Sequence, residues 1–242
     1  SFRGFRGFCG CPISMCIAED RHGFAMDNTH IRVCDFEHVV FFTGAGLSAS
    51  CGIPTYRGKG GIWKNYDYKQ YACQTAFDAD PAGVWEFHNY RRELVAACKP
   101  NLAHRCISKC QALLPEVTII TQNIDGMHQR AGATKVIELH GSLWRSRCEH
   151  CGFRVEDLDV PASNVRCEYC TGKYRRPDIT WFGDALDERV VNLAVASIET
   201  CDLLVSIGTS GTVYPAAQMP MYAKQRGATL VEVNPEETAV SS

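Results

Sequence analysis

The sequence lacks the features of a membrane-spanning, repetitive or strongly charged protein. No stretch approaches the roughly 20 uninterrupted apolar residues that a membrane span requires. The 25 basic and 27 acidic residues leave a net charge of −2, so we expect no nucleic-acid partner and no membrane partner. We find no internal repeat and no low-complexity tract. The 242 residues, 45% of them apolar and 21% charged, suit one large globular domain, alone or with a small insert.

Cysteine, in contrast, is abundant, with 14 residues in the chain. In a small secreted domain this number would indicate a disulfide framework. Ten of the cysteines follow no repeating interval, and several lie in apolar runs where a reduced cysteine packs as a small hydrophobic side chain. A reducing, intracellular compartment is therefore the preferred interpretation. The ten are Cys9, Cys11, Cys16, Cys34, Cys51, Cys73, Cys98, Cys106, Cys110 and Cys201.

The two ends of the chain carry little pattern. Residues 1–30 show neither helical nor strand periodicity, so we expect an unstructured or leader segment. Arg3 and Arg6, without an acidic residue among the first ten, are compatible with a transit peptide, and a mitochondrial location is favoured over a cytoplasmic one. A disordered leader or a gene-model artefact fits equally well. At the other end, a doubly wound sheet normally continues with another element, so we expect the C-terminus to be truncated at Ser242.

Between the ends, apolar β-branched runs alternate with helical patterns. Buried strands alternating with helices indicate an α/β fold, with a Rossmann-like, mainly parallel sheet and helices on both faces. Residues 145–176 interrupt this alternation and predict a small zinc-binding insert, so that 31–144 and 177–242 form the Rossmann-like domain. Strands are predicted at 39–46, 117–123, 135–142, 178–183, 202–208 and 228–234. Helices are predicted at 30–38, 80–98, 101–114, 185–200 and 214–226, with a long loop over 53–71.

A glycine-rich turn follows the first apolar strand. Residues 44–49, Gly-Ala-Gly-Leu-Ser-Ala, fit the G-x-G-x-x-G/A pattern, in which glycines permit a tight turn and the start of a helix offers free amides to a pyrophosphate. A glycine-rich turn without a ligand is the alternative. The acidic residue that dehydrogenases carry at the end of the second strand is absent, because the next β-branched run begins only at about residue 117.

Four cysteines form two pairs with the spacing of metal ligands. Cys148 and Cys151 are one C-x-x-C pair, and Cys167 and Cys170, fifteen residues further on, are the other. Two such pairs supply the four sulfurs of a tetrahedral Zn²⁺ site, and since no position remains for water the role is structural. A redox pair or a nucleic-acid-binding ribbon is the alternative. The seven basic residues of this segment are largely offset by five acidic ones, which favours a solvated surface over a nucleic-acid interface.

Polar side chains follow two further predicted strands. Gln122, Asn123, Ile124 and Asp125 come after the run that begins at 117, and His140 comes after the run that begins at 135. In an open α/β sheet the ligand crevice lies outside the carboxyl ends of the strands. A histidine there can act as a general base, although a single such histidine is more often structural. Three strand ends around one crevice favour the catalytic interpretation.

Taken together, these segments resemble the sirtuins. The matching pieces occur in the order of the family and extend over roughly residues 30–236, nearly the whole chain. They are TGAGLSASCGIPTYR (43–57), TQNIDGMH (121–128), ELHGS (138–142), the two cysteine pairs, ITWFGD (179–184), GTS (208–210) and VEVN (231–234).

The resemblance implies an NAD-dependent deacylase that acts on acyl-lysine proteins or peptides and releases nicotinamide and O-acyl-ADP-ribose. NAD would be the co-substrate, one Zn²⁺ would be structural, and His140 would be the catalytic base. The substrate backbone would pair with Trp181, Phe182 and Gly183. NAD would be held by Gly44, Ala45, Gly46, Ser48, Thr55, Tyr56, Arg57, Gln122, Asn123, Ile124, Asp125, Gly208, Thr209, Ser210, Asn234, Pro235 and Glu236.

The resemblance extends to a subgroup that removes succinyl, malonyl or glutaryl groups. That subgroup carries a small residue and a Tyr-x-x-Arg pair, and here Ala72 and Arg91 match while His88 replaces the tyrosine. One helical turn separates His88 from Arg91, so both can face one pocket, and a buried arginine suits a carboxylate. We therefore predict a preference for acidic acyl groups. A solvated Arg91 on a plain deacetylase is the alternative.

Three other functions stay open at this point. A mono-ADP-ribosyltransferase would use every NAD-binding residue and differ in its acceptor. A dehydrogenase with a structural zinc would lack its acidic ribose ligand and leave His140 without a role. A non-catalytic NAD-binding or zinc-ribbon module would tolerate the loss of His140.

Overall fold

A computed structural model describes residues 31–56, 61–64, 66–170 and 173–238 of the chain. The predicted leader at 1–30, the candidate NAD contact Arg57 and the last four residues lie outside the described residues. Among the helices that are described, none combines the length and the apolar character needed to cross a bilayer.

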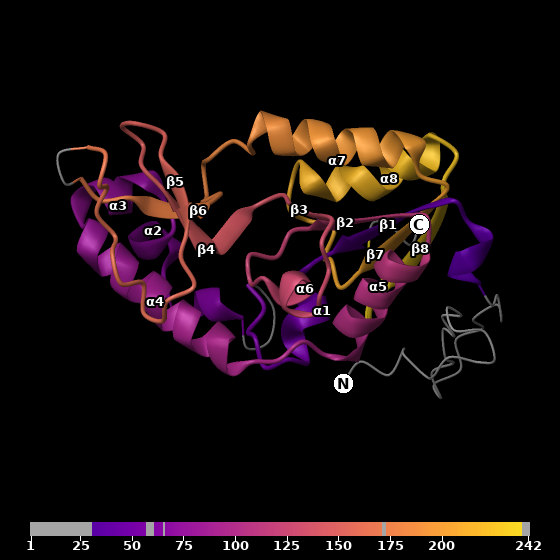
Figure 1. Ribbon diagram of the computed structural model, residues 1–242, viewed down its shortest axis with the longest axis horizontal. Helices are drawn as coiled ribbons and strands as arrows, with labels where there is room; N and C mark the ends of the chain where they lie inside the picture. The colour runs from indigo at the N-terminus through magenta and orange to yellow at the C-terminus, as the bar shows by residue number, and fades with distance from the viewer. Residues whose placement is uncertain (1–30, 57–60, 65, 171–172, 239–242) are drawn as a thin grey trace.

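Five parallel strands form the central sheet, in the order β3-β2-β1-β7-β8 (Figure 1). Five consecutive residues are buried in each of β1, β2 and β7, because both faces of the sheet are covered. Strands buried on both faces need apolar residues at nearly every position, which explains the continuous apolar runs in the sequence. The strands are β1 (His38–Thr43), β2 (Glu116–Thr121), β3 (Val136–Glu138), β7 (Leu203–Ile207) and β8 (Thr229–Val233).

Helices cover both faces of this sheet, as predicted. Alternate residues of β1 serve the two sides: Phe41 packs with Leu47 and Ile107, whereas Phe42 packs with Ile198 and Ala223. Figure 1 shows α7 and α8 along one face and α1, α5 and α6 along the other. These helices are α1 (Ala45–Ala49), α5 (Leu102–Leu113), α6 (Met127–Arg130), α7 (Glu188–Thr200) and α8 (Met219–Gln225), the last preceded by the 3₁₀ turn η3 (Ala216–Gln218).

Local capping sets the start of the long helices. In α4 (Pro81–Ala97), proline occupies the first position and the Asp80 carboxylate accepts the N–H of Gly83 at 2.9 Å. Asn101 caps α5 in the same way by accepting the N–H of His104 at 3.0 Å. Both helices therefore begin within one or two residues of the predicted positions.

Three predicted boundaries were wrong. The helix predicted at 30–38 is only the 3₁₀ turn η1 (Val33–Asp35), because β1 already begins at His38. The loop predicted at 53–71 contains η2 (Ile62–Lys64) and α2 (Tyr68–Tyr71), and α3 (Gln74–Ala79) follows. The strand predicted at 178–183 is β6 (Arg176–Ile179) and belongs to a different sheet. Short polar elements show too few turns to reveal a period, which explains these errors.

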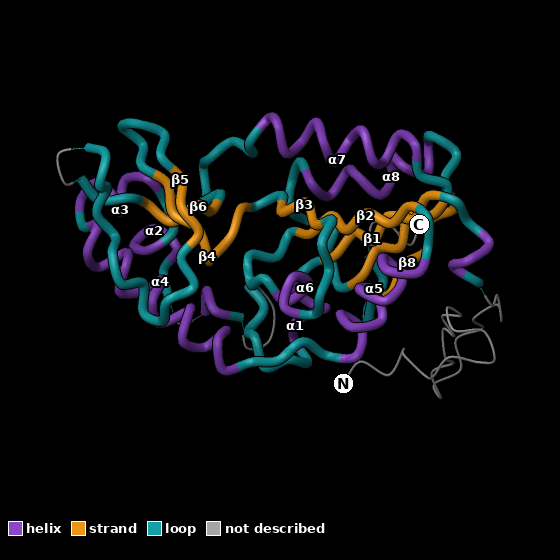
Figure 2. Tube along the Cα trace, viewed as in Figure 1, coloured by secondary structure: helices purple, strands orange, loops and turns teal. Residues whose placement is uncertain are grey.

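That second sheet has three antiparallel strands in the order β5-β4-β6 and lies at one end of the molecule, beside α2, α3 and α4 (Figure 2). Its apolar side shares a core with these helices, in which Trp181, Phe77 and Trp85 take part. The strands are β4 (Gly141–Arg147), β5 (Arg154–Glu156) and β6. The predicted insert at 145–176 thus begins within β4 and ends within β6.

Candidate active site and metal centre

The strands of the main sheet end in register. Thr43 at the end of β1 pairs with Thr121 of β2 on one side and with Ile207 of β7 on the other. The residues that follow these strands therefore meet at one edge of the sheet. The strand order reverses between β1 and β7, and open α/β sheets bind their ligands at such a point, outside the carboxyl ends of the strands.

The glycine-rich turn packs directly on the end of β7. The N–H of Gly44 donates to the carbonyl of Ile207, and the N–H of Gly46 donates to the carbonyl of Gly208, both at 2.9 Å. A Cβ atom on Gly44 would lie 2.7 Å from the Gly208 oxygen, which is closer than real contacts allow. Gly208 itself has φ +62°, a conformation that favours glycine. Glycine is thus needed at these positions because two backbone segments touch.

The turn after β2 is fastened to the start of α1 by polar side chains. The Asn123 amide donates to the carbonyl of Gly44 at 3.0 Å, and the Ser48 hydroxyl donates to the Asp125 carboxylate at 2.7 Å. Asp125 also accepts the N–H of Met127 at 2.9 Å. Burial raises the pKa of the Asp125 carboxyl group, while these two hydrogen bonds favour its charged form. The arrangement holds a carboxylate in a largely water-free position.

A narrow pocket opens between this polar cluster and α4. It brings together six residues predicted to hold NAD and one, Arg91, predicted to bind substrate. Its apolar lining was not predicted, although Val95 lies one turn beyond Arg91 on α4 and helical spacing indicates that it shares the face. The lining residues are Ala45, Ser48, Tyr56, Arg91, Asn123, Ile124 and Asp125, with Ile53, Pro54, Val95 and Leu143.

Two buried histidines support the pocket from behind, and neither was predicted. His128 Nε2 lies 2.9 Å from the Thr43 hydroxyl, and His104 Nε2 lies 3.5 Å from the Ser48 hydroxyl. Asn101 fixes the other ring nitrogen of His104 at 2.8 Å. Burial lowers the pKa of His104 to about 4 and that of His128 to about 3, so both rings are neutral near pH 7. The sequence carries no spacing that distinguishes them from other histidines.

His140 lies in the turn between β3 and β4, at the same edge of the sheet. Its Nδ1 is 2.9 Å from the carbonyl of Gln122, and since a carbonyl only accepts, Nδ1 carries the proton in the neutral ring. Nε2 has no hydrogen-bond partner within the described ranges and is left as a proton acceptor. Burial lowers the pKa of His140, which favours this neutral form. Glu138, at the end of β3, forms an ion pair with Arg145 of β4 at 2.5 Å. This ion pair connects the two strands on either side of the turn that carries His140.

The remaining candidate NAD residues flank this region. The Asn234 amide donates to the carbonyl of Thr209 at 2.8 Å and so joins the ends of β8 and β7. Thr209 is buried, whereas Ser210, Pro235 and Glu236 are exposed. β8 and β3 are opposite edge strands, so these residues lie on the far side of the crevice from His140. The carbonyl of Thr55, next to Tyr56, accepts the N–H of Ile62 at 2.9 Å.

The candidate substrate residues divide into two groups. The N–H of Phe182 donates to the carbonyl of Ala72 at 3.2 Å, which joins the segment after β6 to the end of α2, and Phe182 itself is exposed. Gly183 beside it turns with φ +92°. Trp181 is buried and stacks on His88, with ring centroids 5.9 Å apart.

Arg91 and His88 are both buried on the inner face of α4. Arg91 is 8% exposed, so the alternative of a solvated helix charge was wrong; its Nη2 donates to the Tyr56 hydroxyl at 3.1 Å. Both ring nitrogens of His88 are buried without a hydrogen bond of standard geometry to any described residue. Burial, with a further contribution from the Arg91 charge, lowers the pKa of His88 to about 3. Unlike Arg91, His88 is not among the residues that line the pocket.

The four cysteines of the two pairs converge at the end of the small sheet. Their Sγ atoms all lie within 4.8 Å of one another, with Cys148 and Cys170 3.6 Å apart and Cys151 and Cys167 also 3.6 Å apart. Four sulfurs at about 2.3 Å from a tetrahedral Zn²⁺ would be about 3.8 Å apart, which these distances match. Hydrogen bonding from the Cys151 N–H lowers the pKa of the Cys148 thiol to about 6, whereas the neighbouring cysteines raise the pKa of Cys170, so Cys148 is the ligand that most readily becomes the thiolate that zinc binds.

The cluster is a site for structural zinc, as predicted. All four ligands are cysteines, and none of the described cysteines forms a disulfide. The convergence of all four sulfurs on one centre favours a metal site over a redox pair, which needs only two cysteines.

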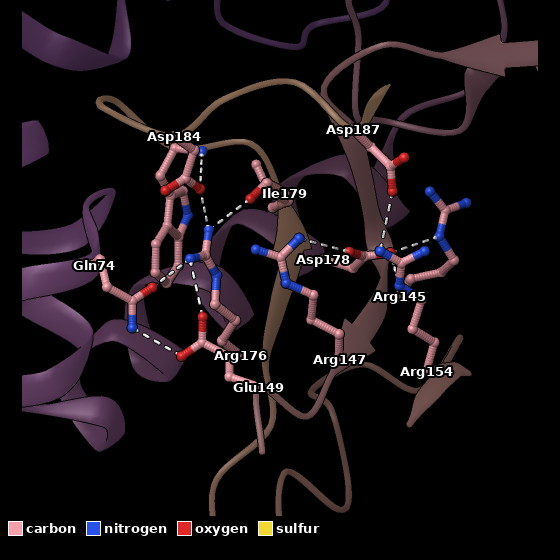
Figure 3. Close-up of polar contacts among 11 residues, drawn as sticks. Gln74, Arg145, Arg147, Glu149, Arg154, Arg176, Asp178, Ile179, Asp184 and Asp187 are labelled. Atoms are coloured by element: carbon pink, nitrogen blue, oxygen red, sulfur yellow. Dashed lines mark hydrogen bonds and ion pairs between the residues drawn. The ribbon is translucent and has the colours of Figure 1, made fainter. Parts of the chain in front are cut away.

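Ion pairs tie the zinc-bearing sheet together (Figure 3). The buried Asp178 of β6 accepts from Arg145 at 3.3 Å and from Arg147 at 3.4 Å, both on the neighbouring β4. Arg176 is 1% exposed and is paired with Asp184, and its guanidinium carbon lies 3.8 Å from the centre of the Trp181 ring. Two charged residues of β6, Arg176 and Asp178, are therefore interior residues, which explains why this strand has no apolar period.

The parallel sheet, the crevice at its switch point and the four-sulfur centre define a zinc-stabilised α/β protein of the Rossmann-like class. Residues 44–215 match the family model described as the Sir2 family. The chain belongs to the Sir2 family, as the resemblance to sirtuins predicted.

Relatives and solved structures agree with this placement. The chain is 42% identical over 206 residues to an NAD-dependent protein deacylase of Aquifex aeolicus, covering 84% of this chain and 86% of the relative. It is 46% identical over 204 residues to an NAD-dependent protein deacylase of Aeropyrum pernix, covering 84% and 82%. A Sir2 homologue solved as an NAD complex has a TM-score of 0.79 at 40% identity, covering 86% of this chain and 82% of that one.

A further solved structure, a histidine-to-asparagine mutant of a Sir2 homologue in complex with ADP ribose, has a TM-score of 0.81 at 38% identity and covers 86% of this chain and 84% of that one. The predicted fold class, NAD as the co-substrate of the family and the structural zinc are thereby confirmed.

Proposed function

We propose that this chain removes acyl groups from protein lysine side chains at the expense of NAD, with the release of nicotinamide and O-acyl-ADP-ribose. The observation that carries the proposal is His140, a neutral imidazole with an unused Nε2 at the sheet edge where the glycine turn and the pocket of Asn123 and Asp125 also lie. The relatives named NAD-dependent protein deacylases support it. A solved Sir2 complex with a deacetylated p53 peptide supports acyl-lysine proteins as the substrate class.

NAD supplies an ADP-ribosyl group with nicotinamide as the leaving group. The bond to a cationic nicotinamide is already activated, so the protein needs to position the ribose and exclude water more than to provide strong acid catalysis. The glycine turn offers backbone amides to the pyrophosphate, and Gln122, Asn123, Ile124 and Asp125 position the nicotinamide end. The fixed hydrogen bonds of Asn123 and Asp125 support this role, because positioning requires groups that are themselves held.

His140 acts as the base in this scheme. After the acyl carbonyl oxygen has displaced nicotinamide from the ribose, Nε2 would accept the proton of a ribose hydroxyl, so that this oxygen can bond to the acyl carbon. Addition of water and departure of the lysine amine would then release O-acyl-ADP-ribose. The hydrogen bond from Nδ1–H to the Gln122 carbonyl orients the ring and directs the proton to Nε2. The same bond stabilises the imidazolium once the proton has arrived.

The outer parts of the site follow from the same proposal. The loop of Thr55, Tyr56 and Arg57 covers the nicotinamide end. The substrate backbone adds as a strand beside Trp181, Phe182 and Gly183, of which Phe182 and Gly183 are exposed. The adenosine end contacts Gly208, Thr209, Ser210, Asn234, Pro235 and Glu236. We also propose that the chain divides into an NAD-binding domain and a zinc-binding insert. A mitochondrial location is a separate part of the proposal.

The test mixes the protein, NAD and a succinyl-lysine or a matched acetyl-lysine peptide, and follows nicotinamide release and peptide mass. We expect nicotinamide release that depends on acyl-peptide, with one acyl group lost for each nicotinamide formed. Release without a loss of peptide mass would indicate ADP-ribosyl transfer instead. A rise in NADH absorbance would indicate a dehydrogenase.

The acyl group that best fits the site is acidic. Arg91 is almost fully buried and lines the pocket, yet no carboxylate of the described residues pairs with its guanidinium. A buried cation that forms no direct ion pair is costly, and a carboxylate on the ligand would add two charge-assisted hydrogen bonds to the longer-range attraction of Asp125, which lines the same pocket. His88, one turn away on α4, is neutral but does not line the pocket, so the preference depends on Arg91. We propose succinyl, malonyl or glutaryl as the preferred groups.

Replacing Arg91 with methionine should lower kcat/KM for the succinyl-lysine peptide by about 10- to 100-fold, the range for losing charged hydrogen bonds of about 1.5–3 kcal/mol. Activity on the acetyl-lysine peptide should change much less, because that substrate has no carboxylate. Arg226→Met, which removes an exposed arginine at the end of α8, is the matched control. Equal losses on both peptides would contradict the preference.

A further inference from the structure

A second concave site lies on the outer side of α4. It is a groove of about 490 Å³ between this helix and the zinc-bearing segment. None of its lining residues takes part in the NAD pocket. The helix contributes Ala82, Trp85, Glu86, Asn89, Tyr90 and Glu93, and the other wall consists of Ala162, Val165 and Tyr174.

One helix therefore separates two sites. Arg91 and Val95 of α4 line the inner pocket, and Glu86, Asn89 and Glu93 line the outer groove. Residues three, four or seven apart share one face of a helix, so the two sets project in different directions. The groove is thus a surface of its own and not an extension of the active site.

Hydrogen bonds fix both walls of the groove. The indole N–H of the buried Trp85 donates to the carbonyl of Arg175 at 2.7 Å. The Asn89 side-chain oxygen accepts the N–H of Ala162 at 2.9 Å. In Figure 1 the segment between β5 and β6 runs beside α4, which agrees with this contact. A groove fixed in this way is preformed, and binding to it requires little ordering of the protein.

The chemistry of the groove is aromatic and acidic. Trp85, Tyr90 and Tyr174 give it three aromatic side chains, and Tyr90 is 42% exposed. Glu86 and Glu93 are exposed and form no ion pair with any residue that the structure describes. Cations are attracted both to carboxylates and to the faces of aromatic rings, at about 0.5–1 kcal/mol for each exposed ring contact.

Neighbouring cations do not occupy the acidic side of the groove. Arg92 points away and is paired with Asp157 at 3.2 Å. Arg166 stands 4.3 Å from the centre of the Tyr174 ring, at the opposite wall, and demonstrates that this ring accepts a guanidinium. The acidic wall formed by Glu86 and Glu93 therefore keeps its negative charge.

We propose that this groove binds a basic, extended segment of a protein partner. Lysine or arginine stems pack on the exposed Tyr90 ring while their charged ends reach the two glutamates. Glu86 and Glu93 are seven positions apart on the helix, a distance of about 10 Å along the axis. Residues i and i+3 of an extended segment in the polyproline II conformation point to the same side and are about 9 Å apart, so two basic residues at that spacing match the two carboxylates.

The test measures binding of an unacylated peptide with two basic residues three positions apart, by calorimetry and without NAD, so that its outcome is independent of the deacylase proposal. We expect the double variant Glu86→Lys/Glu93→Lys to weaken binding at least 10-fold and to reduce its salt dependence. A peptide with both basic residues replaced by glutamine should bind as weakly to the unaltered protein.

The matched control is Glu37→Lys, which reverses an equally exposed glutamate before β1, far from α4. It should bind the peptide like the unaltered protein, and melting temperatures check that all variants are folded. The inference is overturned if the unaltered protein does not bind the basic peptide, if the double variant binds it equally well, or if Glu37→Lys weakens binding as much as the double variant does.

Discussion

Replacing His140 with alanine should lower the rate of peptide deacylation by about 10²- to 10⁴-fold, the usual contribution of a general base. The reason is that Nε2 of His140 is the only part of this ring free to accept a proton, since Nδ1 is committed to the Gln122 carbonyl. The measurement is the rate of loss of the acyl group under saturating NAD and peptide. His38→Ala is the matched control, because His38 lies at the opposite end of the same sheet, where it contacts Thr200.

The pH dependence follows from the same ring. Burial lowers the pKa of His140 below the ordinary 6.5, so the base is already neutral at pH 7. Deacylation should therefore stay constant as the pH falls toward 6.5 and decline only when the pH passes below the lowered pKa and Nε2 becomes protonated. The residual activity of His140→Ala should lack this decline. An alanine variant that keeps full activity would leave the proposed function without its base.

Loss of one zinc ligand should unfold the zinc-bearing sheet. Structural zinc contributes about 10–16 kcal/mol of apparent binding free energy in small domains, comparable with the whole stability of an ordinary protein at about 5–15 kcal/mol. Cys167→Ala removes a buried ligand, so we expect less than one zinc per chain and a melting temperature lowered by more than 10 °C, or no cooperative transition. Metal analysis and thermal unfolding measure the two effects.

Cys73→Ala is the control for this substitution. Its half-buried thiol lies outside the cluster, where it contacts the Lys69 carbonyl and the Thr75 hydroxyl at 3.2 Å each, so zinc content should be unchanged. A chelator should reproduce the effect of Cys167→Ala on the unaltered protein. If Cys167→Ala retained one zinc and the original melting temperature, the cluster would not be the metal centre.

The main sheet was predictable because its signals are local. β1 and β7 are buried on both faces, and only a continuous apolar run satisfies that condition. The start of α4 depends on Asp80 and Pro81, which are neighbours in the chain. The small sheet was not predictable in this way. Asp178 is buried because arginines of another strand neutralise it, and no window of sequence contains both partners.

In the candidate site, too, the residues with local sequence signals were predicted and those defined by long-range contacts were not. The glycine turn, Asn123, Asp125 and His140 stand directly after strands, so their common location follows from strand order and register. His104 and His128 were missed because what distinguishes them, a buried hydrogen bond to Ser48 or Thr43, joins residues more than 50 positions apart. His88 and Arg91 were expected to face one pocket because they are one helical turn apart. Only Arg91 lines the pocket, because Trp181 stacks on the His88 ring, and this packing cannot be read from helical spacing.

The sequence by itself determined the family, the use of NAD and the zinc centre. The reason is that each cysteine pair and the glycine-rich turn consist of residues only a few positions apart. Tertiary structure alone decided that Arg91 is buried with no ion-pair partner among the described residues, and that the outer face of α4 forms an acidic aromatic groove. Burial and electrostatic environment are set by side chains that arrive from distant segments. Their effect on a residue therefore exists only once the chain has folded.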